Sequence, residues 1–198
     1  LVELLSGGRD DNRGTDTIFK LYDFIRSHPF YEDWLAGKEK MYDPAIPAEQ
    51  TVWGKTILAY GTEAITYCLQ QNRELLEQMD GILELEKAYG APFREDGQRL
   101  SALLSSLRSG DWDGCCAQLQ TFSFGRLGAL RGFEDDVLKK SLQSRRDQIK
   151  KIIKGLAQRQ FCADAGEFRE DISDLRPKVS TLFSLVLAYD RQYSQLKK

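Results

Sequence analysis

Basic residues are concentrated in one segment of the sequence, between Leu138 and Gln160. This segment contains eight basic residues and one acidic residue, Asp147, whereas the whole chain has a net charge of −2. A local excess of positive charge suits contact with phosphates, because each phosphate that is neutralised releases bound counterions. Such contacts position a nucleic acid without reading its base sequence. The segment therefore predicts a sequence-tolerant phosphate-binding surface that contacts a nucleic acid.

A helical projection of this segment predicts which way its side chains point. At about 100° per residue an apolar set falls on one side, namely Leu138, Leu142, Ile149, Ile152, Ile153 and Leu156. We predict that the opposite side carries the phosphate-binding residues, called here the basic ridge: Lys139, Lys140, Arg146, Lys150, Lys151 and Lys154. The preceding link extends this candidate surface with Arg126 and Arg131, beside Phe124 and Phe133. The alternative is a charged helix side that is simply hydrated.

Motifs for nucleotide hydrolysis and for metal binding are incomplete in this chain. Residues 54–56 (Gly-Lys-Thr) look like the end of a phosphate-binding loop, which also needs a preceding strand and a glycine where this chain has Glu49. Residues 134–136 (Glu-Asp-Asp) are better explained as the start of a helix, where the helix dipole favours negative charge. Residues 111–114 lack the further ligands of a calcium loop. We therefore predict no catalytic residues.

Side chains that commonly form zinc sites and hydrolytic triads are scarce. His28 is the only histidine, and it precedes Pro29, where a helix must end. No Cys-x-x-Cys pair occurs among the four cysteines, which are Cys68, Cys115, Cys116 and Cys162. We therefore predict no metal site and no triad, and we expect the thiols to behave as small buried hydrophobic groups.

The composition is that of a folded chain. Of its 198 residues 41% are hydrophobic and 11% aromatic, enough for a substantial core. The sequence has neither a run of eighteen apolar residues nor a signal-peptide pattern, so we expect no membrane contact and a cytoplasmic location. A helical pattern already begins at Leu1 and another continues to Lys198, so we expect an internal piece of a larger protein.

Helices must position the basic segment, because apolar residues recur at intervals of three and four along the chain. No alternating run rich in Val, Ile and Thr has the length of a strand. The sequence therefore predicts an all-α fold, a multi-helix bundle with one or more long helices. We expect one helical region over residues 1–198, with sub-parts 1–43 and 51–198.

Glycine and proline predict the helix boundaries in the first half of the chain. A turn is predicted at 6–11, a helix from about Asp16 to Pro29, and a short helix around Trp34. After the connection at 42–50, the pattern predicts a long helix over 51–89. Gly81 is one of its weak points, and the Gly-Ala-Pro sequence at 90–92 is predicted to end it.

The second half is expected to contain shorter helices around 100–107 and 112–122, the latter capped by Asp111. A glycine-rich link at 124–132 then leads to the basic segment, predicted to be helical over 134–160. The last helix is expected to run from about Glu167, with Pro177 able to start or kink it.

Two stretches carry a resemblance to a known family. Residues 2–35 contain a Gly-Gly-x-Asp-Asp turn, a Leu-Tyr-x-Phe helix, a Ser-x-Pro and a Trp-Leu pair. Residues 112–193 contain a Phe-x-Arg-Leu element at 124–127, a basic helix and a final helix with Tyr189 and Tyr193. The chain thereby resembles the AddA subunit of the bacterial AddAB helicase-nuclease, a UvrD-like superfamily 1 helicase. Residues 42–110 do not contribute to this resemblance.

The resemblance implies that the chain is similar to the helical accessory 1B region, which lies against duplex DNA ahead of the strand-separation point. It implies a DNA-contacting module of an ATP-dependent helicase and exonuclease acting in double-strand-break repair and homologous recombination. ATP and Mg²⁺ are implied for the parent protein only, and no cofactor for this chain. The implied partners are duplex or junction DNA and an AddB-like subunit.

The alternative function is a protein-docking scaffold for the partner nuclease subunit. The centre of a protein interface is poor in charge, so exposed aromatic residues on a second face would favour this alternative. Candidates for that face, each equally suited to a core, are Tyr42, Tyr60, Tyr89, Tyr189 and Tyr193. A free-standing helical enzyme would need an acid–base cluster that the sequence lacks.

Overall fold

Apolar residues spaced three and four apart form amphipathic helices along residues 12–197, the part of the chain that the computed structural model describes. No strand occurs among these residues, and the predicted all-α class is confirmed. The turn predicted at 6–11, with its Gly-Gly-x-Asp-Asp sequence, and the helical pattern predicted from Leu1 lie outside the described residues. The chain divides into two compact units, residues 48–166 and residues 1–47 with 167–198.

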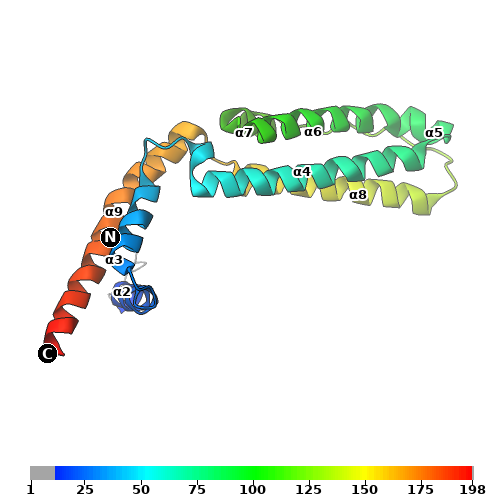
Figure 1. Ribbon diagram of the computed structural model, residues 1–198. Helices are drawn as coiled ribbons and strands as arrows, with labels where there is room; N and C mark the ends of the chain where they lie inside the picture. Colours follow the sequence, from blue (N-terminus) through cyan, green and yellow to red (C-terminus); the bar gives the residue numbers. More distant parts are fainter. Residues whose placement is uncertain (1–11, 198) are drawn as a thin grey trace. The chain divides into compact units, whose positions relative to one another are not determined.

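Residues 48–166 form a helical bundle, in which α6 and α8 run antiparallel to α4 (Figure 1). Its long helices are α4 (Val52–Met79), α6 (Ala91–Ser109) and α8 (Asp136–Gly155), and α7 (Trp112–Gln120) is shorter. Short elements adjoin them, namely η2 (Ala48–Gln50), α5 (Leu83–Leu85) and the π-helices η3 (Glu86–Gly90) and η4 (Leu156–Gln160).

The bundle core consists of aliphatic and aromatic side chains from each long helix. Fully buried members are Ile65, Leu75, Met79, Phe93, Leu100, Leu103, Leu142 and Phe161. Gly61 permits close packing on α4, because a Cβ atom there would lie 2.9 Å from Leu107 Cδ2 of α6. Trp112 packs on Phe161 at 5.2 Å between ring centroids, and its indole nitrogen donates to the Ala163 carbonyl. These contacts join α7 to the residues that follow α8.

The predicted long helix over 51–89 is divided in the structure near Gly81, one of its predicted weak points. Helix α4 ends at Met79, and Gly81 adopts a positive φ of 77°, the left-handed conformation that commonly terminates helices. The Gly-Ala-Pro sequence at 90–92 does not interrupt the helical backbone, because α6 begins at Ala91 directly after η3, with Pro92 in its first turn. Proline is tolerated there because the first backbone N–H groups of a helix have no intrahelical partner. The boundary prediction was therefore wrong.

Side-chain caps define the starts of three helices in this unit. Asp111 Oδ1 accepts a hydrogen bond from Gly114 N at 3.0 Å, so the predicted cap is confirmed. Asp135 Oδ1 accepts from Leu138 N at 2.9 Å and begins α8. Thr51 Oγ1 accepts from Gly54 N at 2.9 Å, so the Gly-Lys-Thr sequence lies in the first turn of α4 and not in a phosphate-binding loop.

The other unit contains α2 (Asn12–Ile25), α3 (Tyr31–Glu39), η1 (Lys40–Tyr42) and most of α9 (Ala165–Leu196), which includes Pro177. Its buried cluster is Tyr22, Ile25, Leu35 and Val186, against which Leu182, Phe183 and Tyr189 pack. This packing places the last helix with the N-terminal helices. The expected sub-part 51–198 is therefore divided, since residues from Glu167 belong to this unit.

Candidate nucleic-acid interface

Helix α8 packs against the bundle through one apolar side, as its sequence predicts. Leu142, Ile149 and Ile153 are buried, and so is Leu156 at the start of η4. This side fixes the rotation of the helix about its axis, because apolar area removed from water stabilises the packed arrangement. The rotation in turn determines which basic side chains face solvent.

Arg146 lies on the buried side of α8, so its placement on the solvent-facing ridge was wrong. The residue is 2% exposed. Its Nε atom donates to Asp96 Oδ2 at 2.7 Å, and a terminal nitrogen donates to the Gly125 carbonyl at 2.8 Å. Its guanidinium carbon also lies 5.2 Å from the centroid of the Phe93 ring. A side chain held in this way has no access to a phosphate.

The sequence contained the signal for this burial. Position 146 follows Leu142 by four residues and precedes Ile149 by three, the spacing of neighbours on one side of a helix. The charge of Arg146 is balanced by Asp96, which is also buried. Burial raises the pKa of the Asp96 carboxyl group, and the hydrogen bond from Arg146 opposes that rise by favouring the charged form.

Two lysines of the basic ridge are ion-paired within α8. Lys150 Nζ lies 2.9 Å from Asp147 Oδ1, and Lys139 Nζ lies 3.9 Å from Asp136 Oδ1. Both lysines are half-buried. Pairs of this kind near the surface contribute little to stability, but they reduce the positive charge available to a ligand.

The exposed part of the ridge consists of Lys140, Lys151 and Lys154. Within residues 12–197 the structure shows no ion pair for any of them. Arg126 and Arg131, the predicted extension, are also exposed, in the link that precedes α8. These cations therefore remain available to an anionic partner. Their use by a phosphate stays a prediction.

An extended link connects α7 to α8 along the side of the bundle. Gly128 N donates to the Ala88 carbonyl at 2.9 Å, next to η3. Arg99 of α6 donates to the Ser123 carbonyl, and Arg146 of α8 donates to the Gly125 carbonyl. Side chains from α6 and α8 thus fix the backbone of the link. The sequence predicted its lack of helix but not these anchors.

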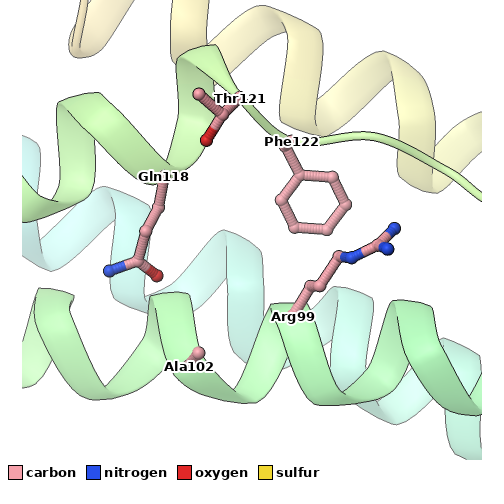
Figure 2. Close-up of a pocket in the computed structure, with 5 residues that line it drawn as sticks. All are labelled: Arg99, Ala102, Gln118, Thr121 and Phe122. Atoms are coloured by element: carbon pink, nitrogen blue, oxygen red, sulfur yellow. The ribbon is translucent and has the colours of Figure 1, made fainter.

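Two shallow depressions flank the C-terminal half of α8. One is lined by Phe122 and Phe124 of the link together with Lys150 and Lys154. The other is lined by Lys151, Arg159 and the exposed Tyr60. A third depression lies between α6 and α7, where the Phe122 ring lies beside the Arg99 side chain (Figure 2). No sequence signal indicated these groupings, because their members come from different helices.

The cysteines and tyrosines divide by burial. Cys68, Cys115 and Cys116 are buried as expected, whereas Cys162 is exposed and that expectation was wrong for it. Burial raises the pKa of Cys68 and of Cys115 to about 12.

Among the predicted docking tyrosines, Tyr89 is buried in the bundle, Tyr42 and Tyr189 are half-buried, and Tyr60 and Tyr193 are exposed.

Clusters of metal ligands and membrane-spanning helices are absent from residues 12–197. No group of three or more His, Cys, Asp or Glu side chains is arranged to hold a metal ion in this part of the chain. Among the same residues, no helix has the length and apolar character needed to span a membrane.

Comparison with known proteins finds relatives of one kind, and each of them aligns with the whole chain. No family model matches it. The chain is 30% identical over 206 residues to the A subunit of the ATP-dependent helicase/nuclease of Geobacillus kaustophilus, and 30% over 208 residues to that of Acetivibrio thermocellus. It is 26% identical over 200 residues to that of Ruminiclostridium cellulolyticum.

In these three alignments all of the chain is covered, but only 16% of each relative. The alignments also include residues 42–110, which carried no resemblance in the sequence motifs. The predicted resemblance to the AddA family is thereby confirmed. Along its whole length the chain is related to a segment of the AddA-type subunits of ATP-dependent helicase/nucleases.

Proposed function

We propose that this chain is a DNA-contacting accessory module, similar to the 1B region of UvrD-like helicases, within an ATP-dependent helicase/nuclease. The observation that carries the proposal is the set of exposed lysines on α8, Lys140, Lys151 and Lys154, in a chain related to helicase/nuclease subunits. Lysine ammonium groups on flexible stems suit phosphate oxygens, because they act as point charges without a required bond geometry.

The contact made by these lysines is to the sugar-phosphate backbone and is tolerant of base sequence. Such contact lets a motor move along DNA, since every position offers the same phosphates. In the proposed whole protein, other segments bind ATP and Mg²⁺ and supply helicase and nuclease activity in double-strand-break repair. The residues of this chain hold the DNA, and an AddB-like subunit is the expected partner.

Charge reversal tests the proposal directly. Binding is measured by fluorescence anisotropy with a labelled duplex that carries a single-stranded tail, for the wild type and for Lys151→Glu with Lys154→Glu. We expect the double variant to bind about tenfold or more weakly, because it loses two cationic contacts and adds repulsion. Lys150 is left unchanged because it is paired with Asp147.

A matched control is Lys55→Glu with Arg73→Glu, which changes the net charge equally at exposed positions of α4. This control should bind DNA within about twofold of the wild type when measured at physiological salt, where screening limits long-range effects. Circular dichroism verifies that both double variants keep their helices. Equal affinity of the α8 variant and the wild type at low salt would refute the proposal.

A second candidate function is protein docking through α2 and α3. Phe24 is 54% exposed and Phe30 is 76% exposed, and exposed apolar side chains that form a patch mark protein interaction sites. The test is capture of the partner subunit by the wild type and by Phe24→Ser with Phe30→Ser. Loss of capture without loss of DNA binding would assign docking to this surface.

A further inference from the structure

Phe122 lines two depressions in the bundle. On one side it lines the depression formed with Arg99, Gln118 and Thr121 (Figure 2). On the other side it lines the depression that contains Lys150 and Lys154, called here the Phe122 groove. The Phe122 ring lies beside the Arg99 side chain (Figure 2), and the same residue also lines the depression that contains the two lysines of α8.

The base of the Phe122 groove is apolar. Leu119 of α7 and Ile153 of α8 line it, and both are buried. Phe124 lies beside Phe122 at 4.9 Å between ring centroids, with an angle of 45° between the ring planes. Hydrogen-bonding groups occur at the edge, where Gln120, Gln158 and Lys154 stand. The groove thus combines an apolar surface with a polar, positively charged edge.

The aromatic side of the groove is fixed by the bundle. The Ser123 carbonyl accepts a hydrogen bond from Arg99, and the Gly125 carbonyl accepts one from Arg146. The Arg146 guanidinium carbon lies 5.4 Å from the centroid of the Phe124 ring. Because Arg146 is itself paired with the buried Asp96, these contacts hold the link in one position. A ligand would therefore meet a preformed surface, which lowers the entropic cost of binding.

This combination of groups discriminates between forms of DNA. A duplex keeps its bases stacked inside and presents mainly phosphates and sugars to a shallow surface. An unpaired nucleotide presents a flat base within reach of its own phosphate, which matches an aromatic surface beside a cation. Lys154 is exposed and unpaired within the described residues, whereas Lys150 is paired with Asp147. Lys154 is therefore the residue placed to contact that phosphate.

We propose that the Phe122 groove binds an unpaired nucleotide of single-stranded DNA, with the base on Phe122 and the phosphate at Lys154. This inference rests on the proposed DNA-contacting function and adds a second, single-strand contact to it. Lys140 and Lys151 then serve the duplex, and the Phe122 groove serves a strand that has separated. Side chains from α7, the link and α8 together form the site.

The test compares labelled oligothymidylate with a blunt duplex by fluorescence anisotropy, using the 198-residue chain. Phe122→Ala should weaken binding of the oligothymidylate by about 5- to 140-fold, the range found for loss of one base-stacking aromatic residue. Binding of the duplex should stay within about twofold. Phe122→Tyr keeps an aromatic ring and should bind the oligothymidylate nearly as the wild type does. Phe133→Ala, in the same link, is the matched control.

A second measurement applies if Phe122→Ala destabilises the bundle. Phe122→Trp places an additional indole in the groove. Oligothymidylate should quench the tryptophan fluorescence of this variant saturably and more strongly than it quenches that of the wild type, whereas the duplex should not. If Phe122→Ala weakens the binding of both DNA forms equally, or changes neither, the assignment of the groove is wrong but the proposed DNA-contacting function still stands. Failure of the wild type to bind any DNA at low salt would overturn the proposed function as well.

Discussion

The individual basic residues of α8 serve different purposes according to their surroundings. Arg145 donates to Gln71 Oε1 at 2.8 Å and pairs with Glu74, so it joins α8 to α4. Arg146 is buried against Asp96. Lysines with little contact remain at the surface. Arginine suits the buried positions because its planar guanidinium group satisfies several acceptors at once.

Replacement of Arg146 should therefore lower the stability of the folded protein as well as change its net charge. Arg146→Ala leaves the buried Asp96 carboxylate without its partner, and we expect a loss of about 3–5 kcal/mol in unfolding free energy. Lys151→Ala removes the same charge at an exposed position and should change stability by about 0.5 kcal/mol or less. Urea denaturation followed by circular dichroism measures both. Equal stability of the two variants would contradict the structural role of Arg146.

The cysteine thiols should differ in reactivity. Cys68 and Cys115 are buried, and a pKa of about 12 keeps each thiol protonated at neutral pH. Cys162 is exposed and should react with iodoacetamide in the folded protein. Mass spectrometry of the labelled peptides should show modification of Cys162 alone until urea is added. Labelling of Cys68 at the same rate as Cys162 in the folded protein would contradict this burial.

Among the secondary-structure elements, the helix ends of the bundle depend on individual glycines. Gly81 has a positive φ and lies just beyond the end of α4, where the chain turns toward α5. Gly155 has an ordinary helical conformation at the junction of α8 and η4. A Cβ atom would meet nothing within 4 Å at either position. The two glycines therefore differ in backbone conformation and not in available space.

Alanine substitution should have opposite effects at these positions. Gly81→Ala forces a side chain into the left-handed region and should destabilise the protein by about 1 kcal/mol. Gly155→Ala reduces the entropy of the unfolded chain at no steric cost and should stabilise by about 0.4–1 kcal/mol. Thermal denaturation of the two variants and of the wild type shows whether each substitution raises or lowers the stability of the protein. If Gly81→Ala stabilised the protein, the left-handed backbone conformation at Gly81 would not be needed to end α4.

The chain as a whole has a net charge of −2, although α8 is locally positive. Association with DNA therefore depends on a local surface, since the net charge is mildly repulsive toward phosphates. Salt should weaken such binding, because counterions compete at the few contacted phosphates. The number of exposed lysines predicts how steep that dependence is.

Contacts from Lys140, Lys151 and Lys154 to three phosphates predict a slope of about −2.7 for the logarithm of affinity against the logarithm of salt concentration, measured with a duplex that carries a single-stranded tail. Between about 50 mM and about 200 mM salt, affinity should fall about 40-fold. Lys140→Ala should reduce the slope by about 1. A slope near zero in the wild type would exclude phosphate contact as the source of affinity, and an unchanged slope in the variant would exclude Lys140.

Much of the helical content followed from the sequence alone, because it depends on local spacing and capping. The three- and four-residue periodicity predicted the all-α class, and Asp111 marked the start of α7. The break after Met79 was harder to predict, since a glycine can be accommodated inside a helix as well as end one. The family resemblance also came from the sequence, through motifs near both ends of the chain.

Tertiary structure decided which groups lie together. The partnership of Arg146 with Asp96, separated by 50 residues, depends on how α6 and α8 both pack on α4. The same packing determines which lysines stay exposed, and it places Phe122 and Lys154 in the lining of one depression. Local patterns record which side of a helix is apolar, but they carry no information about its neighbours. Contacts between distant residues are fixed only when the helices bury their apolar sides together, and the candidate site consists of such contacts.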